Sequence, residues 1–145
     1  MSSTNVFSKP VKTIMENDVL SDIVHEDEEL LLAKNFIKRL SEIENSPNEF
    51  FVTVIDNANV VKGIVTRADL ETAANKIAKN KRVTFREVAS TPVIMKEGDS
   101  IRCALDTFEQ KNTRIILIVN EQNVYVGKLR ISTIRKKIMD LFDAN

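Results

Sequence analysis

The fold of this chain is decided by residues 54–70, which read VIDNANVVKGIVTRADL. A second copy lies 64 positions later, in residues 118–134, which read IVNEQNVYVGKLRISTI, and the two align without a gap. Two of the chain's three glycines, Gly63 and Gly127, fall at equivalent positions. Because an internal repeat sets the architecture of a protein, the chain is predicted to contain two similar halves that pack on each other.

Each copy is predicted to form a strand, a turn, a second strand and the start of a helix. The first strands coincide with nearly continuous apolar runs at 50–55 and 115–119, a pattern typical of strands covered on both faces. Asp and Asn side chains, which favour turns, follow at 56–59 and 120–123. The closing helices are predicted over 68–79 and 132–142.

The similarity extends upstream of these copies. Residues 11–19 align with 85–93, and each half then has a helix-start signal rich in acidic residues or Ser, at 27–30 and 98–101. Apolar residues recur at helical spacing after both signals, so an amphipathic helix is predicted in each half. These residues are Leu30, Ala33, Ile37 and Leu40 in the first half and Ile101, Ala104, Leu105 and Phe108 in the second.

Each half is therefore predicted to be an α+β unit of the order strand, helix, strand, strand, helix. The first half carries about seven extra residues within 41–49, where a longer surface loop or an extended helix end is expected. The predicted organisation is an N-terminal tail at 1–10, repeat one at 11–79, and repeat two with its C-terminal helix at 80–145.

The composition excludes several classes of function. The 21 basic residues equal the 21 acidic ones, so no overall positive field favours nucleic acid. No apolar run approaches the roughly 20 residues that span a bilayer, and the N-terminus does not resemble a signal peptide, so a cytoplasmic location is expected. One His and one Cys exclude a His/Cys zinc site within one chain. His25 is predicted to be solvated, and Cys103 to be a small core residue.

The segment that carries chemistry runs from Gly63 to Asp69. Thr66 and Arg67 lie where a strand is predicted to end and a helix to begin, where free N–H groups suit a phosphate. A Thr hydroxyl and an Arg guanidinium add donors, and Asp69 can accept two hydrogen bonds from the vicinal hydroxyls of a ribose. The competing interpretation is structural: Thr66 caps the helix and Asp69 is its capping-box partner.

The repeated pattern resembles a tandem pair of CBS domains, named for cystathionine β-synthase and also called a Bateman module. The resemblance covers about 11–138 and depends most on 13–15 and 56–70 in repeat one, and on 90–94 and 119–127 in repeat two. It implies two β-α-β-β-α repeats packed pseudo-symmetrically through their sheets. It also implies a non-enzymatic regulatory module that binds AMP, ADP, ATP or S-adenosylmethionine between the repeats, forms a homodimer, and acts on an effector enzyme or transporter.

The resemblance also implies site residues. The family motif of Gly, two apolar residues, Thr or Ser, two variable residues and Asp is matched at Gly63, Ile64, Thr66 and Asp69, where the hydroxyl meets phosphate and the carboxylate meets ribose. Thr13, Ile14 and Met15, at the start of repeat one, are expected to line the base pocket, although the half that supplies the base wall is left open.

Repeat two departs from the motif, because Arg130 stands at the hydroxyl position and Thr133 at the carboxylate position. Arg130 is either a further phosphate contact or a solvated surface residue. One competent site per chain is therefore expected, with no metal and no required cofactor. The degenerate second repeat also favours an alternative function, that of a ligand-free scaffold whose repeats serve to dimerise.

Overall fold

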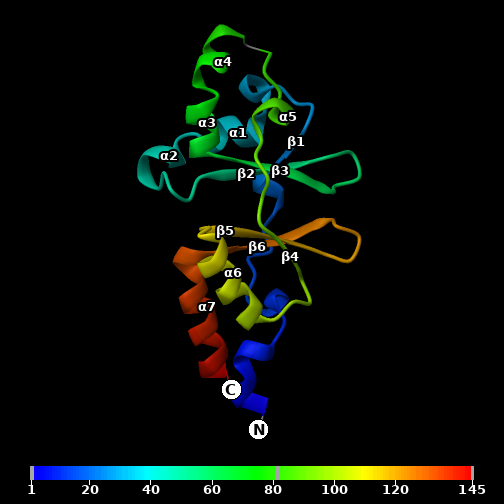
Figure 1. Ribbon diagram of the computed structural model, residues 1–145, viewed down its shortest axis with the longest axis vertical. Helices are drawn as coiled ribbons and strands as arrows, with labels where there is room; N and C mark the ends of the chain where they lie inside the picture. Colours follow the sequence, from blue (N-terminus) through cyan, green and yellow to red (C-terminus); the bar gives the residue numbers. More distant parts are fainter. Residues whose placement is uncertain (1, 81, 145) are drawn as a thin grey trace. The chain divides into compact units, whose positions relative to one another are not determined.

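The computed structural model describes residues 2–80 and 82–144, which form two compact units (Figure 1). The first-repeat unit is Leu20–Pro92. The second-repeat unit combines the residues up to Val19 with those from Val93 onward. Each unit contains one three-stranded sheet, so the predicted α+β fold with two sheets is confirmed.

The sheet of the first-repeat unit has the order β1-β2-β3. Strand β1 (Ile23–His25) is parallel to β2 (Phe51–Ile55), and β2 is antiparallel to β3 (Val61–Thr66). The helices of this unit are η3 (Leu20–Asp22), η4 (Leu30–Leu32), α1 (Lys34–Arg39), α2 (Glu42–Asn45), α3 (Arg67–Thr72), α4 (Ala74–Lys79) and α5 (Phe85–Val88). Its core is centred on three edge-to-face aromatic rings, with Phe36 5.3 Å from Phe85 and 6.2 Å from Phe50.

The second-repeat unit repeats this arrangement with β4 (Ile94–Lys96), β5 (Ile115–Val119) and β6 (Tyr125–Arg130). Its helices are η1 (Ser2–Ser8), η2 (Val11–Thr13), α6 (Ile101–Lys111) and α7 (Ile131–Ala144). Alternate residues of β5, Ile116 and Ile118, join α6, α7 and the N-terminal segment in one apolar core. Alternate side chains of the strand point to one face of the sheet, and there they pack against the apolar sides of the two helices.

The repeated turns confirm the alignment at the level of single atoms. Asn59 and Asn123 both adopt left-handed backbone conformations, with φ of 63° and 64°. The Oδ1 atom of Asp56 accepts hydrogen bonds from the amides of Ala58 and Val60. Asn120 makes the equivalent pair of bonds to Gln122 and Val124. Each antiparallel pair also carries an irregularity one residue before its turn.

The compact units do not follow the order of the sequence repeats. Residues 85–92 lie in the first-repeat unit, and residues 11–19 lie in the second-repeat unit. Ser90 pairs with Ile64 through amide bonds of 2.9 and 3.0 Å, and Glu16 pairs with Lys128 in the same way at 2.9 and 3.0 Å. We call residues 11–19 and 85–92 the lead segments, because each precedes the first strand of its own repeat. Each unit therefore contains the lead segment of the other repeat. The boundaries at 11–79 and 80–145 delimit the two sequence repeats, and their use as domain boundaries remains a prediction.

Three local predictions are corrected. The first amphipathic helix is interrupted at the extended residue Ala33, so Phe36 is buried and the predicted core residue Ile37 is 48% exposed. Cys103 is exposed, because the buried side of α6 carries Ile101, Ala104 and Phe108. The closing helix of the first half divides at Ala73 into α3 and α4, whereas α7 is continuous. The extra residues of the first half form the exposed α2 turn, as predicted.

Candidate functional site

The candidate site is built where β3 runs directly into α3. Thr66 keeps an extended backbone, with φ −113° and ψ 175°, and occupies the N-cap of α3. The Asp69 carboxylate accepts the Thr66 amide at 2.8 Å and the Thr66 hydroxyl at 2.9 Å, both on Oδ2. The capping arrangement expected as the structural alternative is therefore present. It holds the carboxylate in place at the start of the helix.

A third donor reaches Asp69 from the segment that follows α5. Ser90 Oγ donates to Asp69 Oδ2 at 3.0 Å. This segment approaches β3 because Gly63 has no side chain: a Cβ there would lie 2.8 Å from the Cβ of Ala89. Among the described residues no donor uses Asp69 Oδ1, so this oxygen is open to a ligand hydroxyl.

A pocket of about 370 Å³ lies beside this carboxylate. Its lining residues come from α3, α4 and the α5 segment: Asp69, Thr72, Ala73, Lys76, Glu87, Val88 and Ala89. Lys76 and Glu87 form an ion pair of 3.5 Å in this lining. The amide and hydroxyl of Thr84 donate to Glu87 at 2.8 and 3.1 Å and lower the pKa of that carboxyl. The pocket therefore has the hydrogen-bonded Asp69 carboxylate at one side, while the charges of Lys76 and Glu87 in its lining neutralise each other.

A second pocket of about 220 Å³ shares Ala89 with the first. It is lined by Glu26, Val54, Lys62, Arg86, Ala89, Ser90 and Thr91. Ser90 thus lines the second pocket, and its hydroxyl donates a hydrogen bond to Asp69 beside the first pocket. The sequence analysis did not place Ser90 in the site. The alignment of 11–19 with 85–93 marks its segment, but the pairing of that segment with β3 required the structure.

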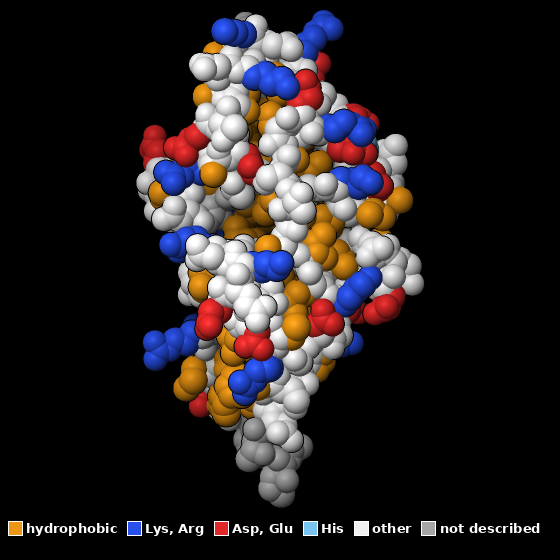
Figure 2. Space-filling model, viewed as in Figure 1, with side chains coloured by type: hydrophobic (Ala, Val, Ile, Leu, Met, Phe, Trp, Pro, Cys, Tyr) orange, Lys and Arg blue, Asp and Glu red, His pale blue; other side chains and the backbone are white. Residues whose placement is uncertain are grey.

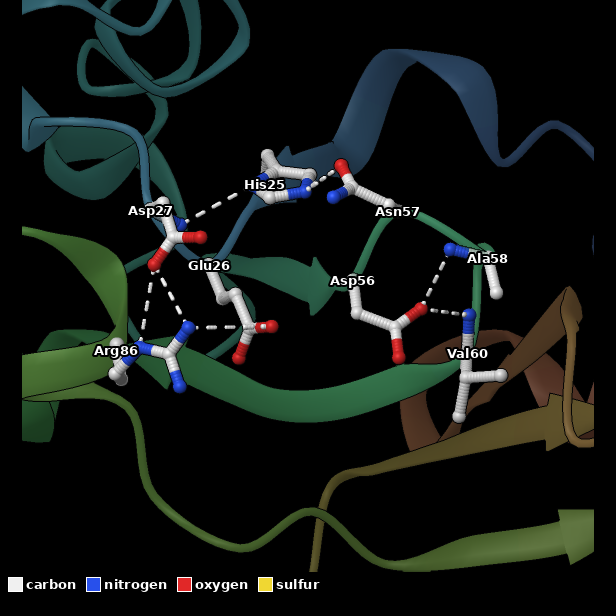
Figure 3. A network of polar contacts seen from close by, with 8 residues as sticks. All are labelled: His25, Glu26, Asp27, Asp56, Asn57, Ala58, Val60 and Arg86. Carbon is white, nitrogen blue, oxygen red and sulfur yellow. Dashed lines mark hydrogen bonds and ion pairs between the residues drawn. The ribbon is translucent and has the colours of Figure 1, made fainter.

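A polar network fixes the edge of the second pocket (Figure 3). Arg86 donates to Asp27 at 2.7 Å and lies 3.4 Å from Glu26, and the contact with Asp27 raises the pKa of Arg86. His25 Nδ1 accepts a hydrogen bond from the Asp27 amide at 3.2 Å, so Nε2 is the nitrogen that donates to Asn57 Oδ1 at 2.6 Å. His25 is half-buried, and both of its ring nitrogens have protein partners, which the sequence did not predict.

The structure gathers only some of the predicted site residues in one unit. Gly63, Ile64, Thr66, Arg67 and Asp69 lie together in the first-repeat unit. The Arg67 side chain is 42% exposed, lies 3.9 Å from Glu71 and donates to Asn48 at 3.5 Å, and it lines neither of the two pockets. Its geometry is that of a surface arginine.

The predicted base-pocket residues lie in the second-repeat unit, the unit of Arg130. Thr13 is exposed and its hydroxyl donates to the carbonyl of Pro10 at 2.7 Å. Ile14 is 3% exposed within the core, and Met15 packs against the same core. In the first-repeat unit the equivalent positions are taken by Glu87, Val88 and Ala89, which line the pocket beside Asp69.

The second-repeat unit carries an exchanged version of the Asp69 arrangement. Thr133 stands where the first repeat has Asp69, and Glu16 stands where it has Ser90. The Thr133 hydroxyl donates to Glu16 Oε2 at 3.1 Å, and Arg130 Nε lies 3.5 Å from the same oxygen. A carboxylate–hydroxyl pair is thus present in both units, with the two groups exchanged between helix and lead segment. In this unit the carboxylate is already paired with an arginine.

The charge distribution agrees with the neutral composition. Lys, Arg, Asp and Glu side chains are interspersed over the coloured part of the face seen in Figure 2. Among the described residues no group of three or more His, Cys, Asp or Glu is arranged to hold a metal ion. No helix in the described ranges is long and apolar enough to cross a membrane.

Comparison with known proteins identifies the class. Residues 85–140 match the family model of the CBS domain. Among solved structures, the CBS domain of a bacterial CNNM/CorC family Mg²⁺ transporter in complex with ATP has a TM-score of 0.67 and 16% identity, covering 95% of this chain and 92% of that one. CBSX2 in complex with AMP has a TM-score of 0.69 and 14% identity, covering 92% and 98%. No curated protein matches.

A third structure, Hypoxic Response Protein I with two coordinated zinc ions, has a TM-score of 0.66 and 19% identity, covering 88% and 97%. The family match thus shows a CBS domain within residues 85–140, and the similar structures, together with the two sheets, show that the chain has the fold of a tandem CBS pair.

Proposed function

We propose that this protein is a non-enzymatic regulatory module that binds an adenosine-containing ligand through Asp69. One observation carries the proposal: the Asp69 carboxylate is fixed by three donors on Oδ2, while Oδ1 accepts no hydrogen bond from the described residues and the group borders a 370 Å³ pocket. A fixed carboxylate with a free oxygen suits the vicinal hydroxyls of a ribose. Apolar contacts from Val88 and Ala89 would support the base.

Related folds support this proposal. CBS-domain structures of similar fold have been solved with ATP and with AMP, and CBS domains are generally regulatory rather than catalytic. Our proposal includes a cytoplasmic homodimer that acts on an effector enzyme or transporter, with no nucleic-acid partner. A ligand would shift the equilibrium between two states of the module only through its different affinity for them.

We also propose that each chain has one such site. In the second-repeat unit the Glu16 carboxylate is paired with Arg130 and Thr133, both of which would otherwise face a ligand anion. The hydroxyl-bearing Thr133 cannot accept a ribose diol as a carboxylate does. Arg130 therefore acts in a structural ion pair rather than as a phosphate contact.

The decisive experiment is thermal unfolding of the protein with AMP, ADP, ATP and S-adenosylmethionine, repeated with Asp69→Asn and with the control Glu71→Gln. Glu71 is exposed on the same helix, and the polar contact of its side chain within the described residues is the long ion pair with Arg67. A ligand at 100 times its Kd adds about 2.7 kcal/mol, which raises the Tm by about 5 to 10 °C for a chain of this size. We expect Asp69→Asn to lose this rise and Glu71→Gln to keep it.

The rise with ligand, and not the Tm of the free protein, is the quantity to compare, because Asp69→Asn also weakens the cap of α3. A full ligand response in Asp69→Asn would contradict the site. No response of the unchanged protein to any adenosine compound would contradict the function.

The alternative is a ligand-free scaffold, and one observation favours it. Four large apolar side chains of the first-repeat unit are exposed: Leu20 at 76%, Leu32 at 73%, Ile37 at 48% and Leu31 at 43%. A scaffold would give a dimer in light scattering that is weakened by Leu32→Ser and indifferent to nucleotides. A nucleotide response would exclude this alternative as the sole function.

A further inference from the structure

The second pocket contains a positive charge that the protein does not neutralise at close range. Lys62, on β3, lines this pocket and makes no hydrogen bond or ion pair with any described residue. Its charge acts on Asp56 at longer range, where it helps to lower the pKa of that carboxyl. Asp56 Oδ1 is meanwhile occupied by the turn amides of Ala58 and Val60. The ammonium of Lys62 is therefore available to an anion from outside the protein.

The other charges of this pocket are balanced. Arg86 is held by Asp27 and Glu26 through Nε and Nη2, which leaves Nη1 without a bond to the described residues. One guanidinium thus faces two carboxylates, and Lys62 supplies a cation with no such partner. The hydroxyl-bearing residues Ser90 and Thr91 complete the lining. Because the Ser90 hydroxyl already donates to Asp69, the groups of this lining that suit phosphate oxygens are the Lys62 ammonium, the spare guanidinium nitrogen and the Thr91 hydroxyl.

The position of this pocket relates it to the ribose site. Ser90 lines it and donates to Asp69, and Ala89 lines both pockets. A ligand whose ribose lies on Asp69 would therefore meet the second pocket across a single residue. The first pocket has no equivalent cation available, since its Lys76 is paired with Glu87.

We propose that this second pocket is the phosphoryl subsite and that Lys62 is its binding cation. The inference rests on the proposed function, and it narrows the ligand to adenosine phosphates. S-adenosylmethionine has a sulfonium where AMP has its phosphate and carries a net positive charge despite its carboxylate, so Lys62 should favour an adenosine phosphate over it. The second repeat has Val126 at the position of Lys62, which agrees with one phosphate site per chain.

Isothermal titration of adenosine, AMP, ATP and S-adenosylmethionine tests the subsite, using Lys62→Gln and the control Lys79→Gln. Both lysines are exposed in the first-repeat unit, and Lys79 lines neither pocket. Because a hydrogen bond to a charged group is worth about tenfold or more in affinity, we expect AMP to bind at least about ten times more tightly than adenosine. Lys62→Gln should abolish most of this preference and leave adenosine binding unchanged, whereas Lys79→Gln should keep it.

Two results would overturn the subsite while leaving the proposed function intact. One is an AMP preference that survives in Lys62→Gln, and the other is S-adenosylmethionine binding more tightly than AMP. Failure of the unchanged protein to bind any of the four compounds would instead overturn the proposed function, and the subsite with it. The preference is a ratio of two affinities in one variant, so a general loss of stability would not imitate its loss.

Discussion

Replacing Gly63 with alanine is expected to destabilise the first-repeat unit by about 1–3 kcal/mol. The new Cβ would lie 2.8 Å from the Cβ of Ala89 and 3.3 Å from the carbonyl oxygen of Ser90. Carbon atoms prefer separations of about 3.5–4.0 Å, and Ala89 has no rotamer with which to withdraw. The backbone of the lead segment must therefore move by roughly 1 Å from β3.

That movement acts on two hydrogen bonds, Ile64 N–H to Ser90 O at 3.0 Å and Ser90 N–H to Ile64 O at 2.9 Å. Stretching both by this amount takes them out of range, and each contributes about 1 kcal/mol. The total corresponds to a fall in Tm of about 2 to 12 °C for a chain of this size. Because Ser90 also holds Asp69, the same variant should bind the ligand more weakly.

The other two glycines provide graded controls for a thermal unfolding series. No atom lies within 4 Å of a Cβ built on Gly98, so Gly98→Ala should be neutral or stabilising by up to about 1 kcal/mol. At Gly127 the new Cβ meets first the flexible thioether of Met15, which can rotate away, and then the carbonyl oxygen of Glu16 at 3.1 Å. The Tm should be highest for Gly98→Ala, intermediate for Gly127→Ala and lowest for Gly63→Ala. A Gly63→Ala protein as stable as Gly98→Ala would refute the close approach of the lead segment.

Two more predictions concern charged groups. Glu16→Gln should lower the Tm by the equivalent of at most about 1 kcal/mol, because Glu16 and Arg130 are both partly exposed. The difference in Tm between this variant and the unchanged protein should shrink as NaCl is added. A difference that does not depend on salt would argue against the ion pair. The amides of Val60 and Ala58 lower the pKa of Asp56, so its stabilising effect is present above the ordinary carboxyl pKa and is lost as pH falls through the lowered value. Asp56→Asn should keep the turn, as Asn120 does naturally, and show a shallower fall in Tm below about pH 4; an unchanged acid profile would contradict this.

The elements that the sequence predicted well are those determined by neighbouring residues. The apolar runs at 50–55 and 115–119 became β2 and β5, because a strand buried on both faces needs no alternation. The turns at Asn59 and Asn123 followed from side chains that tolerate a left-handed backbone. The strand–helix junction at Thr66 and Asp69 was likewise readable, since a capping box spans only four residues.

The elements that the sequence did not predict depend on contacts distant along the chain. The helix from Leu30 to Leu40 has a regular apolar spacing, yet it breaks at Ala33 and buries Phe36 against Phe50 and Phe85. Tertiary packing outweighs local periodicity in such a short segment. Cys103 was misplaced because the apolar stripe of α6 is narrow, and a small residue at its margin gives no signal of burial.

The exchange of lead segments between the repeats explains why the site could be only half predicted. The alignment of 11–19 with 85–93 shows that the two segments are equivalent, but it does not say which sheet each one joins. In the structure the second-repeat segment supplies Ser90 to Asp69, and the first-repeat segment supplies Glu16 to Thr133. The lead-segment residues Ser90 and Glu16 therefore each belong to the opposite repeat from the helix residue that they contact. They decide whether the carboxylate of a unit is open to a ligand, as Asp69 is, or paired with an arginine, as Glu16 is. Position 133 carries Thr where the motif has Asp, and the carboxylate that Thr133 contacts, Glu16, lies 117 positions away, which no motif within one repeat would reveal.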